Sequence, residues 1–241
     1  MITVVLNGYK RSKYFETQLN SIKNQTLQPS EILLWQNAGD IFDENLTRLV
    51  THASCNKNLG VWARFAFALN ANTEYICVFD DDTIPGKKWL ENCYNTIQTH
   101  DGLLGAIGVR FLTTTNYLPI ERFGWANPNQ NVEEVDIVGH SWFFRRDWLS
   151  TFWRELPDTT QSKIVGEDVH FSYTLKKYLG VKTFVPPHPR NDPEMWGSSP
   201  NTAWSMGQDQ AAISMNHENL KTMSKTYVDY IKKGFNPIKV S

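Results

Sequence analysis

Short apolar runs alternate with longer amphipathic stretches through the first half of the chain. A short apolar run is typical of a buried strand, whereas apolar residues at spacings of three and four are typical of a helix. We therefore expect strands at 2–6, 31–35, 74–79 and 104–109, and helices at 12–24, 60–70 and 87–99. Strands that alternate with helices predict an α/β fold with a mostly parallel central sheet flanked by helices.

The pattern changes after Val109. Residues 110–134 mix aromatic residues with proline and glycine, which predicts an irregular excursion from the sheet. Regular patterning returns with strand-like runs at 135–145 and 181–185 and with helices that begin at Asp147 and span 167–178. Residues 186–207 hold five prolines and have no periodicity, so we expect a long loop of a kind that is often functional.

The last part of the chain, residues 216–241, forms a helical tail in this interpretation. From Glu218 onward, Leu220, Met223, Tyr227 and Ile231 recur at helical spacing, with lysines on the opposite face. The apolar face can pack against the preceding domain, residues 1–215, or against a partner. A helix that lies on a membrane surface is the alternative.

Composition narrows the class of protein. The chain is 41% hydrophobic and 20% charged with a formal net charge of -1, so we expect a soluble globular protein without a general affinity for nucleic acid. Three cysteines without metal-ligand spacing favour a reducing compartment. No stretch approaches the ~20 apolar residues of a membrane span and no signal peptide is visible, which predicts a cytoplasmic location.

Three consecutive aspartates, Asp80, Asp81 and Asp82, follow the apolar run at 75–79. Ligands of open α/β sheets bind at the carboxyl ends of such buried strands. Clustered carboxylates repel one another and imply a compensating cation, and Mg²⁺ or Mn²⁺ prefers oxygen ligands of this kind. Asp80 and Asp82 can face the same side of an extended chain, so they are our candidate metal ligands. The alternative, a helix cap before Pro85, explains one aspartate rather than three.

The triplet resembles the Asp-x-Asp signature of glycosyltransferases with the GT-A fold, in family 2 or a close relative. Residues 4–11 resemble the first strand and nucleotide-binding loop of that family, with Asn7-Gly8 in place of its usual Pro-Thr. Residues 32–37 resemble its second strand, with Gln36 or Asn37 in place of a base-reading aspartate. The resemblance covers roughly residues 1–190. It implies a GT-A fold with a nucleotide-sugar half at about 1–109 and an acceptor half at 110–215.

The resemblance implies a nucleotide-sugar site. Residues 58–64 resemble the family's Asn-x-Gly-x-x-x-Arg stretch, in which a helix N-terminus and an arginine face the nucleotide-sugar. A surface arginine on an amphipathic helix is the other interpretation of Arg64. The implied nucleotide-sugar residues are Leu6, Asn7, Gly8, Tyr9, Asn37, Asn58, Arg64, Asp80 and Asp81.

Two later motifs resemble catalytic and metal-binding parts of the family. Gly166-Glu167-Asp168 resembles its Glu-Asp motif, which implies that Asp168 deprotonates the acceptor hydroxyl; a helix cap is the alternative. His188 resembles the late histidine that completes the metal site in many GT-A enzymes, although a lone histidine also serves structure. His170 would point away from Asp168 on a helix.

Candidate acceptor residues lie in the second half of the chain. Residues 139–146, with His140 and Trp142, occupy the place where such enzymes form the wall between donor and acceptor. Trp142 could stack on a sugar face, and Trp196 in the long loop could close over the substrate. Glu167 completes this set. Packing is the alternative for both tryptophans.

We therefore expect a metal-dependent glycosyltransferase that uses Mn²⁺ or Mg²⁺ and inverts the sugar's configuration through Asp168. Its donor would be a nucleoside-diphosphate sugar, with UDP favoured over GDP, and its acceptor a hydroxyl on a glycan or another molecule. Nucleotidyl transfer is a second possibility, although no glycine-rich loop with a lysine follows the first strand. A non-catalytic carbohydrate-binding module is a third, since the chain has nine tryptophans.

Overall fold

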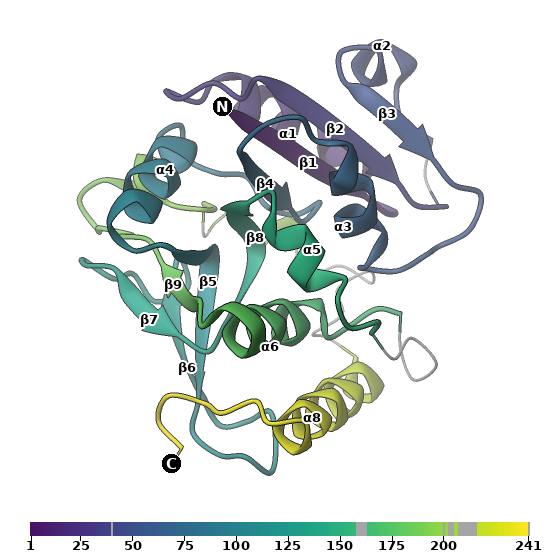
Figure 1. The fold of residues 1–241 in the computed structure, drawn as a ribbon. Helices are drawn as coiled ribbons and strands as arrows, with labels where there is room; N and C mark the ends of the chain where they lie inside the picture. Colours follow the sequence, from purple (N-terminus) through teal and green to yellow (C-terminus); the bar gives the residue numbers. More distant parts are fainter. Residues whose placement is uncertain (40, 158–162, 200, 202–204, 207–215, 241) are drawn as a thin grey trace.

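The computed structural model describes residues 1–39, 41–157, 163–199, 201, 205–206 and 216–240. Within them a nine-stranded sheet has the order β3-β2-β1-β4-β8-β5-β9-β7, with β6 paired to β5 (Figure 1). The strands are β1 (Ile2–Gly8), β2 (Glu31–Gln36), β3 (Thr51–Ser54), β4 (Tyr75–Phe79), β5 (Gly102–Phe111), β6 (Ile120–Gly124), β7 (Glu133–Val135), β8 (Ile137–Arg145) and β9 (Lys182–Val185).

The first four strands are parallel, so their carboxyl ends meet at one edge of the sheet. Beyond β4 the sheet becomes mixed, because β8 runs antiparallel to both β4 and β5. The α/β fold with flanking helices is confirmed; its four N-terminal strands are all parallel, and β5 and β9 form one further parallel pair. The antiparallel β8 brings a segment from the second half of the chain against the end of β4.

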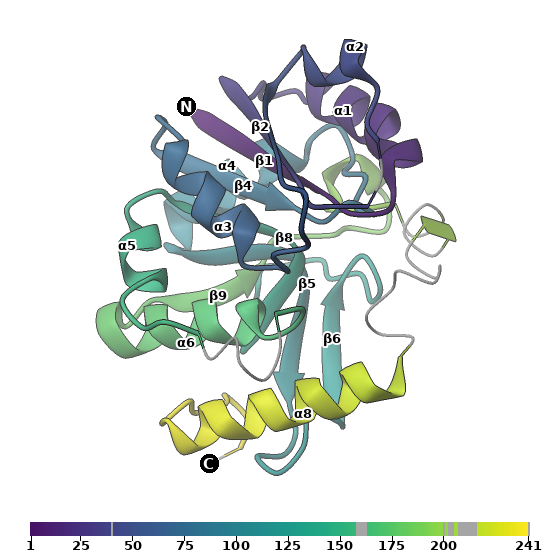
Figure 2. The ribbon, with the colours of Figure 1, turned by 90° about the vertical axis from the view of Figure 1, so that its right-hand side faces the viewer.

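Helices cover both faces of the sheet. Figure 2 shows α3, α5 and α6 along one face and α1 on the other. The helices are α1 (Phe15–Lys23), α2 (Glu44–Thr47), α3 (Ala63–Phe67), α4 (Trp89–Thr99), α5 (Trp148–Phe152), α6 (Glu167–Leu179) and α8 (His217–Lys232), with short 3-10 turns at Ser12–Tyr14, Ala68–Asn70 and Pro193–Met195. None of the helices in the described residues is both long and apolar enough to cross a membrane.

Several elements depart from the sequence prediction. The segment after Val109 is not wholly irregular, because β6 pairs with β5 and extends the sheet. The short β3 was missed because its residues are mostly exposed and polar, and α2 because it has only four residues. The run at 135–145 divides into β7 and β8 at Asp136, whose carboxylate accepts hydrogen bonds from the backbone N–H groups of Phe111 and Ile238.

The C-terminal helix packs on the domain. Tyr227 and Tyr230 of α8 are buried in a second apolar cluster that includes Phe111 of β5 and Tyr173 of α6. The Tyr227 ring stacks on Phe111 with ring centres 3.9 Å apart. The apolar face of the tail is therefore turned inward, as expected for packing against the domain, and these two side chains are not available to a membrane surface.

Candidate functional site

The aspartate triplet stands just beyond β4, all five of whose residues are buried. Its backbone is held from two sides. The Asp80 N–H donates to the carbonyl of His140 at 3.0 Å, and Gln18 of α1 donates to the carbonyls of Asp80 and Thr83. The Thr83 hydroxyl also donates to the His140 carbonyl. The turn that carries the triplet is thus tied to β8 as well as to α1.

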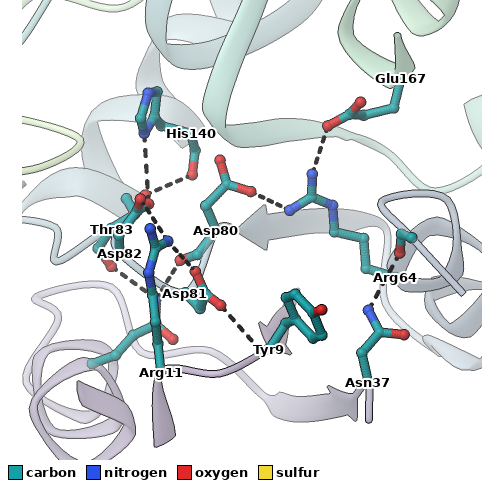
Figure 3. A network of polar contacts seen from close by, with 12 residues as sticks. Tyr9, Arg11, Asn37, Arg64, Asp80, Asp81, Asp82, Thr83, His140 and Glu167 are labelled. Atoms are coloured by element: carbon teal, nitrogen blue, oxygen red, sulfur yellow. Dashed lines mark hydrogen bonds and ion pairs between the residues drawn. The ribbon is translucent and has the colours of Figure 1, made fainter. Parts of the chain in front are cut away.

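Asp81 faces the loop that follows β1. One carboxylate oxygen accepts from the Tyr9 N–H at 3.1 Å, and the other accepts from Arg11 at 2.7 Å (Figure 3). Burial raises the pKa of Asp81 to about 7, and the Arg11 guanidinium opposes that rise. Arg11 also pairs with Asp82 at 2.9 Å and is only 6% exposed. Arg11 ends the segment likened to a nucleotide-binding loop, but its pairing with the triplet could not be predicted, because only the fold brings it there.

Asp80, Asp82 and His140 form a cluster whose ligand atoms all lie within 4.8 Å of one another. His140 Nδ1 lies 3.8 Å from Asp82 Oδ1, which is too long for a hydrogen bond. Both atoms are buried without a hydrogen-bond partner among the described residues. Two carboxylates and an imidazole with unused ligand atoms are a donor set that fits Mn²⁺ or Mg²⁺.

The charges in this cluster influence one another. Burial opposes ionisation of Asp82, but His140 and Arg11 outweigh it and hold the pKa of Asp82 below its usual value. Burial would lower the pKa of His140, but the carboxylates of Asp82 and Asp80 raise it. His140 also has a left-handed backbone with φ of +63°, which is uncommon for a residue with a side chain. Such strain is often found at functional sites.

His188 does not join this cluster, and the structure does not support the prediction that it is a metal ligand. Its side chain is fully buried between Trp89 and Trp196. Nδ1 donates to the carbonyl of Pro186 at 2.8 Å, and Nε2 accepts from the N–H of Gly197 at 3.1 Å. Both ring nitrogens are therefore used inside the protein, so His140 replaces His188 as the candidate ligand.

Arg64 lies between two carboxylates rather than on the surface. Its guanidinium pairs with Asp80 and, at 2.7 Å, with Glu167 (Figure 3). It also covers the ring of Trp142, with 4.6 Å between the guanidinium carbon and the ring centre. Only 2% of Arg64 is exposed, so in this arrangement the predicted contact with a nucleotide-sugar is replaced by contacts within the protein.

The two predicted aromatic platforms are also buried. Trp142 is 2% exposed and the guanidinium of Arg64 covers its ring, so the ring face is not open to a sugar. Trp196 is 9% exposed and donates from its indole nitrogen to the carbonyl of Pro189 at 2.8 Å. In this arrangement both tryptophans pack inside the protein. Glu167 is buried too, which raises its pKa to about 8, while Arg64 opposes that rise.

Asp168 lies in the first turn of α6, next to Glu167. Its carboxylate accepts from the N–H of Val169 at 2.7 Å. Burial raises the pKa of Asp168 to about 6; backbone hydrogen bonds act against this rise, and the charge of Asp80 adds to it. A carboxylate with a raised pKa, close enough to Asp80 to sense its charge, suits a proton acceptor near neutral pH.

The remaining predicted nucleotide-binding residues lie at the carboxyl ends of β1 and β2. Leu6 is fully buried in the sheet, and Gly8 makes room for the ring of Phe42. Asn7 Oδ1 is buried without a hydrogen-bond partner among the described residues, so it is an acceptor that a ligand could use. The side chains of Asn37 and Asn58 instead hold the turn at residues 58–60.

Comparison with known proteins agrees with this geometry. The family model described as "Glycosyl transferase family 2" matches residues 3–157. No curated protein matches the chain. Among solved structures, S. aureus TarS matches with a TM-score of 0.54 and 18% identity over 78% of this chain and 35% of that one.

A second match is S. aureus TarS 1-349 in complex with UDP-GlcNAc, with the same TM-score and identity, over 78% of this chain and 56% of that one. The chain thus spans 35% and 56% of these two structures. The likeness shows a shared fold, and with the family match it confirms the GT-A architecture.

Proposed function

The chain belongs to glycosyl transferase family 2 and is a glycosyltransferase; on that premise we propose that it moves a sugar from a nucleoside-diphosphate sugar to a hydroxyl acceptor with the help of a divalent cation. The cluster of Asp80, Asp82 and His140 at the carboxyl edge of the parallel strands is the observation that carries this proposal. Ligands of open α/β sheets bind at that edge.

In this proposal Asp80, Asp82 and His140 hold Mn²⁺ or Mg²⁺. The negative charge that develops on the departing diphosphate would be neutralised by the bound cation. In the described part of the chain Arg11 pairs with Asp81 and Asp82, and Arg64 pairs with Asp80 and Glu167, whereas five carboxylates lie at positions 80, 81, 82, 167 and 168. A divalent cation would offset much of this excess negative charge.

Asp168 is the proposed general base. As the acceptor oxygen bonds to the anomeric carbon and the bond to the diphosphate breaks, Asp168 takes the proton of the acceptor hydroxyl. Attack from the side opposite the leaving group inverts the sugar's configuration. The raised pKa of about 6 supports this role, because a base of that strength is ionised at neutral pH and still accepts a proton readily.

The donor site lies, in this proposal, at the loop after β1. Asn7 Oδ1 offers an unused acceptor to the nucleotide. We favour a UDP-sugar over a GDP-sugar, and the fold shared with TarS, whose structures include complexes with UDP-GlcNAc and UDP, supports that preference. The acceptor is a glycan or another hydroxyl compound. The three free cysteines are compatible with the cytoplasmic location expected from the sequence.

Family membership argues against the two alternatives, nucleotidyl transfer and a non-catalytic carbohydrate-binding module. The second alternative relied on surplus tryptophans as platforms for sugars. Trp142 and Trp196 are buried and their rings pack inside the protein, which weakens that argument further.

Replacement of the base tests the proposal. Asp168→Asn keeps the size of the side chain but removes the proton acceptor, so transfer should fall by about 10²–10⁴-fold while metal-dependent UDP binding persists. Asp147→Asn is the matched control, because Asp147 also stands at the start of a helix, is exposed and makes no side-chain cap bond. Transfer by Asp168→Asn at the rate of the control would remove the assignment.

A further inference from the structure

The turn at residues 58–61 contacts the segment that leads into α6. The Val61 N–H donates to the carbonyl of Lys163 at 2.9 Å. Gly60 has a left-handed backbone with φ of +77°, and a Cβ added there would lie 1.8 Å from that same carbonyl oxygen. Only a glycine therefore allows the two segments to approach this closely.

The same turn is fixed to the end of β2. Asn37 is 3% exposed, and its Oδ1 accepts from the Leu59 N–H at 3.1 Å, while its amide nitrogen donates to the Gly60 carbonyl at 3.3 Å. The Gly60 N–H donates to the side chain of Asn58 at 2.8 Å. Both polar backbone groups of Gly60 are thus bonded to asparagine side chains, which define the shape of the turn.

Lys163, which accepts the hydrogen bond from Val61, lies just before the start of α6. Lys163 precedes Gly166 by three residues, and Gly166 is the N-cap of the helix that carries Asp168. Gly166 also has a positive φ, +103°, and an added Cβ would lie 2.7 Å from the methyl group of Thr226 on α8. Residues 163–168 therefore lie between the turn on one side and α8 on the other, with little room to shift.

We propose that Asn37 and Gly60 are positioning residues that act through the Lys163 carbonyl to hold Asp168 in place in the first turn of α6. The inference rests on the proposed function in one respect, the role of Asp168 as the base. Asn37 would then serve the base rather than read the nucleotide. A displacement of about 1 Å in a reacting group can cost ~10²-fold in rate, so a small shift of residues 163–168 matters.

Gly60→Ala tests this positioning role, with Gly180→Ala as the matched control. Gly180 also has a positive φ, +67°, but an added Cβ there meets nothing within 4 Å, so the control adds backbone strain without a clash. Gly60→Ala should lower kcat for transfer by about 10- to 100-fold and leave the Kd for UDP with Mn²⁺ within about twofold of wild type. Gly180→Ala should keep the kcat of wild type.

Asn37→Ala tests the same positioning role without adding a steric clash. It removes the side-chain bonds that hold the turn and should lower kcat in the same way, without a change in the Kd for UDP. If Asn37→Ala instead weakens UDP binding or alters the choice of base while kcat is kept, Asn37 contacts the nucleotide and the proposal is wrong.

Hydrogen exchange at residues 163–170 separates this inference from the proposed function, since it needs no turnover. Backbone amides in this segment should exchange faster in Gly60→Ala and Asn37→Ala than in Gly180→Ala, while exchange in β4 is unchanged. Unchanged exchange at 163–170 in both variants would overturn the inference even if the wild type transfers sugar. If the wild type does not transfer sugar, the proposed function fails and the exchange result still decides whether the turn holds α6.

Discussion

His140 is the residue on which the proposed metal site depends most. It reaches the triplet because β8 pairs antiparallel to β4 with Ser141 opposite Phe79, which places His140 beside Asp80. The same residue supplies a backbone carbonyl to Asp80 and Thr83 and an imidazole nitrogen toward Asp82. His140 thus connects the triplet to β8 through both its backbone carbonyl and its side chain.

His140→Gln should weaken Mn²⁺ binding by about tenfold or more, because it removes an imidazole ligand while keeping a polar side chain. Titration with Mn²⁺ followed by electron paramagnetic resonance measures this affinity directly. His188→Gln is the control, since that histidine bonds only within the protein; it should lower Tm but keep the affinity for Mn²⁺. The opposite result, a loss of affinity in His188→Gln alone, would restore His188 as the ligand.

The site could be predicted from the sequence where its residues are adjacent in the chain. The aspartate triplet and the Glu167-Asp168 pair stand out as local motifs. His140 was predicted as an acceptor residue, but the contacts of Arg11 and His140 with the triplet could not be found in that way, because strand register and loop conformation, rather than spacing, create them. The role of His188 was mistaken because the chemistry of a histidine does not reveal whether its nitrogens are already bonded.

At the scale of elements, α8 packs against α6, the helix that carries the proposed base Asp168. His170 of α6 is buried, and burial lowers its pKa to about 4, so the ring is neutral. Its Nε2 donates to the carbonyl of Phe152, so Nδ1 accepts from the hydroxyl of Tyr230 at 2.7 Å. The tail is thereby bonded to the helix that carries Asp168.

Tyr230→Phe should lower the free energy of unfolding by about 1–3 kcal/mol, because Nδ1 of His170 would lose its donor in a buried position. For a chain of this length that corresponds to a fall in Tm of roughly 2–4 °C per kcal/mol. Thermal unfolding followed by circular dichroism measures the change. Tyr94→Phe, at a side chain that is 37% exposed, should leave Tm unchanged; an equal fall in both variants would mean that the bond contributes nothing.

The elements themselves were predicted well where an apolar pattern defined them. The runs that became β1, β4 and β5 are rich in buried residues, β2 has a buried centre at Leu33 and Leu34, and the spacing of apolar residues located α1, α4 and α6. The missed strand β6 owes its conformation to pairing with β5 rather than to its own alternation, since Glu121 and Arg122 lie in its centre. Propensity in short polar strands is weak, so tertiary pairing decides them.

At the scale of the molecule, a parallel half supplies the triplet and the β1 loop, and a mixed half supplies His140 and Asp168. The two halves meet at the neighbouring strands β4 and β8, in the middle of the strand order (Figures 1 and 2). In the proposal the nucleotide binds on the first half, the metal binds between the halves at Asp80, Asp82 and His140, and the second half supplies the base. In this account the arrangement catalyses metal-dependent transfer of a sugar from a nucleotide.

Product analysis tests that claim most directly. The protein is incubated with a panel of UDP- and GDP-sugars in the presence of Mn²⁺ or of a chelator, and the nucleotide products are identified. The account predicts release of a nucleoside diphosphate that requires the cation, with UDP-sugars preferred. Release of pyrophosphate would instead indicate nucleotidyl transfer, and equal release of nucleoside diphosphate with the chelator would contradict the metal-dependent mechanism.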